Sequence, residues 1–320
     1  MLEPQASGLL ELVAAAKAPS FRTVGHAAAR RMHAAMVRRL AGPPKPVAVE
    51  RDFAIPGPGG PIPVRCYASS PDGNLPVLVY FHGGGNVVGD LEMVDEVCRR
   101  IASDAGCVVL SVDYRLAPEH PYPAALEDAY GAVCWVAANA AEIGGDPQRI
   151  AVAGDSAGGT LSALVARYAR DHGGPALAFQ ALIYAAGDIN FSYPSMQTYS
   201  EGYLLTADTI GWFRSQYFPV EPSATDVYAW PLRGESLEGL PPALVITAGF
   251  DPLQDSGIAY GERLVRAGVP VRFVHYAGMV HGFFTYPTYF ERAREAVGEV
   301  ASSLRSAFAD CAVPGRLGVI

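Results

Sequence analysis

The chain has 320 residues, 50% of them hydrophobic and 18% charged, so it can bury a large core and is not intrinsically disordered. Its length fits one large domain, alone or with a modest cap. The formal net charge of −8 argues against nucleic acid and anionic membrane surfaces as partners.

Residues 1–45 are expected to form two helices, the second from Val24 to Leu40. Glu3 stands where a signal peptide would carry positive charge, and no stretch approaches 18 uncharged apolar residues, so neither a leader nor a membrane span is predicted. The expected location is therefore cytoplasmic. Four arginines in the second helix leave a transit peptide or a membrane-surface helix as alternatives, but a solvated helix face packed on the body is favoured.

From Val47 onward, apolar runs alternate with helical patterns, and this alternation predicts an α/β fold with helices on both faces of a mostly parallel sheet. The middle runs are continuously apolar, as expected for strands buried on both faces. The expected strands are Pro63–Ala68, Pro76–Phe81, Cys107–Val112, Arg149–Ala153, Phe179–Tyr184, Ala243–Ala248 and Val271–Tyr276. The expected helices are Ala124–Ala141, Ala157–Arg170, Asp255–Ala267 and Tyr289–Phe308.

The interval Gly187–Glu238 interrupts this alternation and is dense in aromatic residues. About fifty residues are too many for an ordinary connection between two neighbouring strands. We interpret the interval as a helical lid over the edge of the sheet where a site would lie. The five cysteines include no CxxC pair, which predicts buried, reduced thiols rather than a disulfide framework or a zinc knuckle. No role is assigned to the C-terminal tail.

The sequence GDSAGG, from Gly154 to Gly159, follows an apolar strand and opens a helical run. This strand–turn–helix setting is the one that a nucleophile elbow requires, and it places Ser156 at the tip of the turn. The turn is so tight that side chains at positions 154 and 158 would collide, which explains the two glycines. The alternative is a buried turn with a capping serine.

The sequence HGGG, from His82 to Gly85, directly follows another apolar strand. Consecutive glycines let backbone N–H groups approach a reacting atom, and together with the N–H of Ala157 they can donate to an oxyanion. A dinucleotide-binding loop is the alternative, but the glycine spacing does not match GxGxxG. We interpret His82 as structural, with a side chain that pins the loop.

The elbow is followed along the chain by an acid and then a histidine, which is the order expected after a nucleophile elbow. Asp251 comes just past the strand ALVITAG, and His281 follows the strand VRFVHYAG after two more residues. Asp255 competes with Asp251 but suits the first turn of the next helix. Ser156 is thus expected to be the nucleophile, His281 the general base and Asp251 the acid that orients it.

The motifs HGGG, GDSAGG, VDYRLAPEHPYPAALEDAY, DPL and HGF together resemble the hormone-sensitive-lipase-like branch of the α/β hydrolases, the bacterial family IV esterases. The resemblance runs from about residue 45 to residue 305. It implies an oxyanion hole made by the N–H groups of Gly84, Gly85 and Ala157, with Gly83 as a supporting turn. It also implies a cap made of residues 1–45 and 187–238 on a hydrolase core made of residues 46–186 and 239–320.

The expected activity is hydrolysis of short-chain acyl esters through an acyl-enzyme, without a cofactor or a metal. A lactonase, an amidase or a lyase using the same pocket stays open as an alternative, as does a non-catalytic small-molecule receptor. The expected partner is a small-molecule ester, and a homodimer is left open. Among the pocket residues, His82, Gly83 and Asp155 are expected to support the site. Asn86 is expected to border it, at a position that is commonly aromatic in the family.

Overall fold

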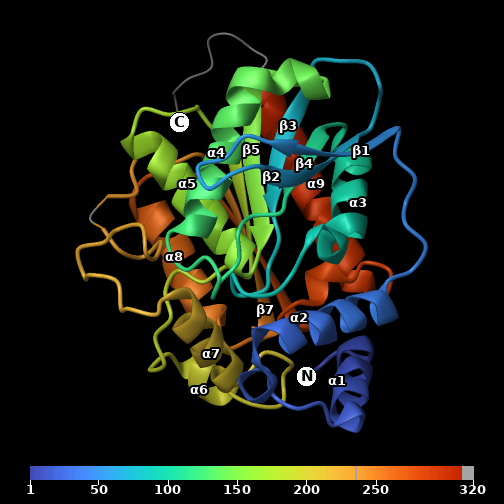
Figure 1. Cartoon of the computed structure of the whole chain (residues 1–320), viewed down its shortest axis with the longest axis vertical. Coiled ribbons are helices and arrows are strands. Elements are labelled where there is room, and N and C mark those ends of the chain that lie inside the picture. Colours follow the sequence, from blue (N-terminus) through green and yellow to red (C-terminus); the bar gives the residue numbers. More distant parts are fainter. Residues whose placement is uncertain (235, 312–320) are drawn as a thin grey trace.

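One eight-stranded sheet runs through the centre of the molecule in the order β1-β2-β4-β3-β5-β6-β7-β8 (Figure 1). The computed structural model describes residues 1–234 and 236–311; the C-terminal tail beyond residue 311 lies outside them. The pairs β1–β2 and β2–β4 are antiparallel, and every later pair is parallel. The predicted α/β fold with a mostly parallel sheet is thus confirmed. The strands are β1 Val49–Ile55, β2 Ile62–Ala68, β3 Leu75–Phe81, β4 Val108–Val112, β5 Gly145–Asp155, β6 Phe179–Ile183, β7 Ala243–Phe250 and β8 Val271–Val280.

Helices cover both faces of the sheet. On one face lie α3 Asp95–Ala105 and α9 Glu291–Cys311, which pack against each other. On the other lie α4 Ala124–Asn139, α5 Ala157–Asp171 and α8 Gln254–Arg266. The central strands β3, β4 and β6 are buried almost throughout because both of their faces are covered, which matches their continuous apolar sequences.

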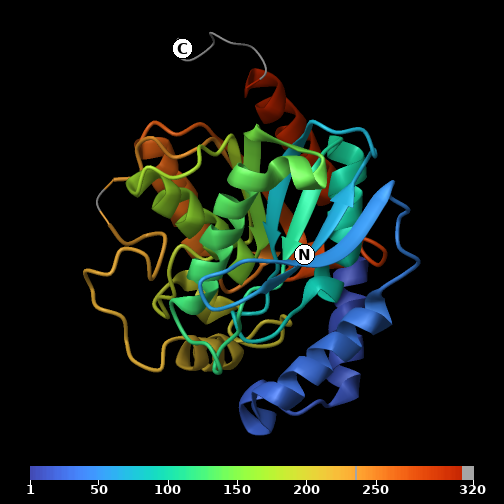
Figure 2. The same ribbon diagram turned by 45° about the horizontal axis from the view of Figure 1, so that its top comes forward.

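The N-terminal helices α1 Pro4–Ala16 and α2 Phe21–Leu40 lie at the same end of the molecule as the helical part of the 187–238 segment, and the chain that follows this part runs along the side of the molecule (Figures 1 and 2). That segment contains two short helices, α6 Pro194–Thr198 and α7 Ala207–Tyr217, and its other described residues form turns and irregular chain. It is therefore less helical than the sequence suggested. Helices α2 and α7 are in contact, and Arg22 of α2 donates to Asp208 of α7 at 2.7 Å.

Helix α2 also holds the main body through Arg30. Its guanidinium donates to the carbonyl oxygens of Val87 and Ala117, at 2.8 and 3.0 Å, and pairs with Glu119 at 2.7 Å. At least this part of the arginine-rich face packs on the body, as the favoured interpretation of the helix required. Within residues 1–234 and 236–311, no helix combines the length and the hydropathy that a membrane-spanning segment needs.

Two details differ from the sequence-based expectations. The elements β1 and α3 were not predicted, because β1 is a charged strand at the sheet edge (VERDFAI) and α3 is rich in charged residues (DEVCRRIASDA). All five cysteines are free thiols as expected, but Cys134 is half-buried and Cys311 is exposed, so burial holds for three of them.

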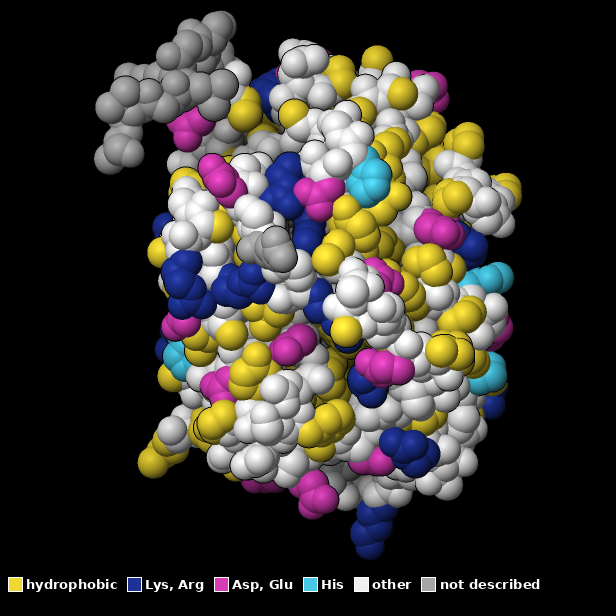
Figure 3. All heavy atoms as spheres, turned by 90° about the vertical axis from the view of Figure 1, so that its left-hand side faces the viewer, with side chains coloured by type: hydrophobic (Ala, Val, Ile, Leu, Met, Phe, Trp, Pro, Cys, Tyr) yellow, Lys and Arg dark blue, Asp and Glu magenta, His cyan; other side chains and the backbone are white. Residues whose placement is uncertain are grey.

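Charge is evenly mixed on the side of the molecule that Figure 3 presents. Lys and Arg side chains are interspersed there with Asp and Glu, and apolar side chains lie between them. Neither sign dominates this face, so it offers no extended field that would steer a charged partner.

Candidate active site

Ser156 occupies the sharp turn between β5 and α5, with φ 54° and ψ −120°. This is an unfavourable backbone conformation for a residue with a side chain, and it persists only where the surroundings fix it. A Cβ on Gly154 would overlap the backbone of Gly158, and a Cβ on Gly158 would overlap the carbonyl of Phe81. The two glycines therefore permit the turn, as the sequence predicted, and the turn presents the serine at the C-terminal edge of the sheet.

A serine, a histidine and a carboxylate are joined by hydrogen bonds at this edge. The Nε2 atom of His281 lies 2.9 Å from Oγ of Ser156, and Nδ1 of His281 lies 2.8 Å from Oδ2 of Asp251. Asp251 is fully buried, and its other oxygen accepts the backbone N–H of Leu253 at 2.8 Å. Because the carboxylate accepts from Nδ1, Nε2 is left without a proton and can accept one from the serine hydroxyl.

Each of these residues directly follows the element that positions it. Asp251 comes immediately after β7 and His281 immediately after β8, at the edge where open α/β sheets build their sites. The competing carboxylate, Asp255, lies in the first turn of α8 and accepts the backbone N–H of Ser195 at 2.8 Å. His275, inside β8, is hydrogen-bonded to Thr247.

The glycine loop after β3 lies beside the serine. The N–H of Gly83 donates to Oδ1 of Asp155 at 3.1 Å and is thereby occupied. The N–H groups of Gly84 and Gly85 have no acceptor among the described residues, and the N–H of Ala157 is free because it begins α5. Gly84 and Gly85 have φ of 107° and 62°, where a side chain would be strained and would overlap Val88 or Phe213.

His82 is completely buried beneath this loop. Its ring stacks on Tyr114 with 4.4 Å between the centroids, and its Nδ1 lies 2.7 Å from the carbonyl oxygen of Gly83. Tyr114 in turn donates to the carbonyl oxygen of His82 at 2.7 Å. These contacts hold the first turn of the loop against the body of the protein.

Asp155 is a second buried carboxylate, one residue before the serine. It accepts the hydroxyl of Tyr80 at 3.0 Å, the N–H of Gly83 and, more weakly, the hydroxyl of Thr285 at 3.5 Å. Burial raises the pKa of this carboxyl above its usual value, and the bond from Tyr80 and the nearby His82 and His281 partly oppose that rise. Asp155 thus ties the glycine loop to the elbow.

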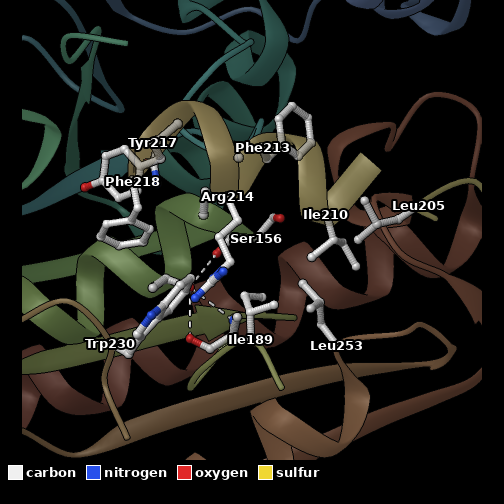
Figure 4. A pocket seen from close by; sticks show the side chains of 15 residues that line it. Ser156, Ile189, Leu205, Ile210, Phe213, Arg214, Tyr217, Phe218, Trp230 and Leu253 are labelled. Atoms are coloured by element: carbon white, nitrogen blue, oxygen red, sulfur yellow. Dashed lines mark hydrogen bonds between the residues drawn. The ribbon is translucent and has the colours of Figure 1, made fainter. Parts of the chain in front are cut away.

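A cavity opens over Ser156 (Figure 4). Its wall is mostly apolar and combines the glycine loop, the start of α5 and the 187–238 segment. The lining residues are Gly85, Asn86, Ser156, Ala157, Thr160, Ala186, Ile189, Leu205, Ile210, Phe213, Arg214, Tyr217, Phe218, Trp230 and Leu253. Of these lining residues, the sequence analysis named only Gly85, Asn86, Ser156 and Ala157.

Helix α7 supplies four of the wall residues that were missed, at positions 210, 213, 214 and 217. This spacing places them on one face of the helix, and it is a signal that the sequence does contain. Asn86 is among the residues that line the cavity. Its φ of 59° adds a backbone reason for its identity, because asparagine tolerates the left-handed region better than most residues.

Within the described residues, no group of three or more His, Cys, Asp or Glu side chains is arranged to hold a metal ion. The hydrogen-bonded side chains of Ser156, His281 and Asp251 can perform nucleophilic chemistry.

Comparison with known proteins gives consistent matches. Residues 78–285 match a family model described as alpha/beta hydrolase fold. Esterase LipI of Mycobacterium tuberculosis is 46% identical over 264 residues, which cover 79% of this chain and 81% of that protein. Among solved structures, the ester-hydrolase EH1AB1 from the metagenome of Lake Arreo superposes with a TM-score of 0.93 at 40% identity, covering 97% of this chain and all of that one. The hyperthermophilic esterase of Pyrobaculum calidifontis gives a TM-score of 0.90 at 43% identity, covering 95% and 98%.

Proposed function

The chain belongs to the α/β-hydrolase family, in its hormone-sensitive-lipase-like branch, and is a carboxylic-ester hydrolase; from this premise we propose that Ser156, His281 and Asp251 are its catalytic triad. The observation that carries the proposal is the unbroken chain of hydrogen bonds from the serine hydroxyl through the imidazole to the buried carboxylate. The serine end of these hydrogen bonds lies at the strained elbow, which faces the cavity.

Hydrolysis then proceeds in two acyl-transfer steps. His281 accepts the proton of Ser156 as the serine oxygen attacks the ester carbonyl, and Asp251 stabilises the imidazolium that forms. His281 next gives that proton to the departing alcohol, which leaves an acyl group on Ser156. A water molecule, activated by the same imidazole, attacks the acyl-enzyme and releases the acid.

The oxyanion formed in each step is stabilised by the free N–H groups of Gly84, Gly85 and Ala157. Within the described residues these N–H groups have no acceptor, and this supports their role, because preorganised donors do not have to break other bonds when charge develops. One such donor is typically worth about 3–4 kcal/mol of activation free energy. Gly83 is excluded from the set by its bond to Asp155 and serves as the supporting turn.

We further propose that residues 1–45 and 187–238 act together as a cap over the core. The location of α1, α2, α6 and α7 at one end of the molecule and the contact between α2 and α7 support this assignment. Because α7 and Trp230 bound the cavity, the cap limits the acyl chain that fits, and we expect highest activity for chains of about C4 to C8.

The test is hydrolysis of p-nitrophenyl esters from acetate to palmitate by the purified protein and by Ser156→Ala. The triad acts as a unit, so we expect Ser156→Ala to lose at least about 10⁴-fold in kcat while keeping its circular dichroism spectrum. The matched control is Ser302→Ala, at an exposed position of α9, which should retain activity. Substantial turnover by folded Ser156→Ala, or a preference for palmitate, would refute the corresponding part of the proposal.

A further inference from the structure

Three residues in the wall of the cavity each have a buried polar atom with no hydrogen-bond partner within residues 1–234 and 236–311. These atoms are Oδ1 of Asn86, Nε of Arg214 and the hydroxyl of Tyr217. Buried polar atoms are almost always paired, because an unpaired one loses its hydration without compensation. Three such atoms around one largely apolar cavity therefore indicate that a bound molecule, or water in its absence, provides partners there.

Arg214 extends from α7 into the cavity, where Figure 4 shows its side chain between Ser156 and Ile189 and beside Trp230. The far end of its guanidinium is already engaged: Nη2 lies 2.5 Å from Glu221, an exposed residue that also approaches Arg233 at 3.7 Å. The charge of Arg214 is thus balanced at the surface, while the Nε–H donor remains free inside.

This arrangement selects the kind of group that would bind. A guanidinium N–H donates to an oxygen acceptor, and a carbonyl oxygen matches its planar geometry. A carboxylate is disfavoured because it would place a second negative charge next to the Arg214–Glu221 pair. A neutral carbonyl oxygen satisfies the donor without adding charge to an apolar cavity.

We propose that Arg214 is a specificity-determining residue, which donates from Nε to a second, neutral carbonyl oxygen of the substrate, separate from the scissile ester. The preferred substrates are accordingly esters that carry a ketone or a further ester group, rather than simple alkyl esters. This inference rests on the proposed function, since it assumes that the cavity over Ser156 holds the substrate.

The experiment compares pairs of esters of nearly equal shape, in which a ketone replaces a branched methyl group. On the acyl side the pair is p-nitrophenyl 4-oxopentanoate and p-nitrophenyl 4-methylpentanoate. On the alcohol side it is 3-oxobutyl acetate and 3-methylbutyl acetate, followed by acid release at constant pH. The ratio of kcat/KM within each pair does not depend on the fraction of folded enzyme, so a poorly folding variant stays informative.

We expect the wild-type protein to favour the ketone by about tenfold in at least one pair, which identifies the side that Arg214 contacts. Arg214→Met, which keeps a long unbranched side chain without a donor, should reduce that ratio to within about twofold of unity. The matched control is Arg22→Met, which removes an ion pair to α7 from a residue outside the cavity wall and should keep the ratio.

Two results would overturn the inference. One is a wild-type ratio near unity in both pairs. The other is a ketone preference that survives in Arg214→Met or is lost equally in Arg22→Met, which would assign it to the position of α7. Failure of the proposed function is distinct from these, because then none of the four esters would be hydrolysed in a Ser156-dependent way.

Discussion

Replacing Asp155 separates two possible roles of this buried carboxylate, a hydrogen-bond acceptor and a negative charge. In Asp155→Ala the hydroxyl of Tyr80 and the N–H of Gly83 both lose their acceptor inside the protein. Each orphaned buried donor costs about 1–3 kcal/mol. Burial raises the pKa of this carboxyl, so the ionised carboxylate itself destabilises the folded state, and its removal offsets part of that loss. We therefore expect the free energy of unfolding to fall by about 2–4 kcal/mol.

Asp155→Asn is the matched variant, because an amide oxygen can occupy the place of Oδ1 and accept from the same two donors. Its amide nitrogen can donate to the hydroxyl oxygen of Thr285, near the place of Oδ2. It also removes the buried charge. We therefore expect Asp155→Asn to be within about 1 kcal/mol of the wild-type stability, or more stable at neutral pH.

The measurements are urea unfolding at pH 7 and kcat for p-nitrophenyl butyrate. Loss of the Gly83 bond loosens the loop that carries Gly84 and Gly85, so kcat should fall more than about tenfold in Asp155→Ala and less in Asp155→Asn. Equal destabilisation of the two variants would show that charge, and not the acceptor, matters. An unchanged stability of Asp155→Ala would refute the account of the orphaned donors.

Two further predictions concern the pH dependence of stability and the substrate specificity. Burial lowers the pKa of His33 to about 4; the nearby Asp90 opposes this shift and His82 adds to it. As the pH falls, His33 is therefore protonated in the unfolded chain before it is protonated in the folded protein. The free energy of unfolding should then fall below about pH 6.5. Between about pH 7 and pH 5, urea unfolding should show the wild type losing about 2 kcal/mol more of this free energy than His33→Gln. Equal losses in the two proteins would show that His33 does not contribute to the pH dependence of stability. Asn86→Trp should lower kcat/KM for bulky or polar esters while sparing p-nitrophenyl acetate, because an indole fills the cavity; equal effects on both would leave Asn86 as scaffold.

The sequence predicted the elements whose pattern is strong and local. The buried strands were found because they are continuously apolar, and the elbow and the glycine loop because their backbone geometry demands glycine at fixed positions. The edge strand β1 was missed because one of its sides faces solvent and carries charge, so its pairing with β2 depends on a distant segment rather than on its own residues.

The wall of the cavity was the least predictable part of the site. Trp230 lies in irregular chain. The sequence places Arg214 on one face of a helix with three other wall residues, but only the folded chain shows that this face lies over Ser156. The partners of Asp155 illustrate the same limit, since Tyr80 and Thr285 are separated from it by 75 and 130 positions. No short-range pattern encodes such contacts, which depend on the order of the strands in the sheet.

The position of α1 has a consequence for how this protein folds during its synthesis on the ribosome. The N–H of Glu3 bonds to the carbonyl of Gly278, its carboxylate pairs with Arg292, and Gln5 donates to the carbonyl of Tyr289. These partners are translated nearly 290 residues later, which takes roughly 15–60 s at ordinary rates of synthesis. Arg30, in contrast, meets Val87 and Ala117 early. The segment that carries Glu3 and Gln5 is therefore synthesised long before the residues that it binds, and its apolar side must remain exposed until those residues have been translated.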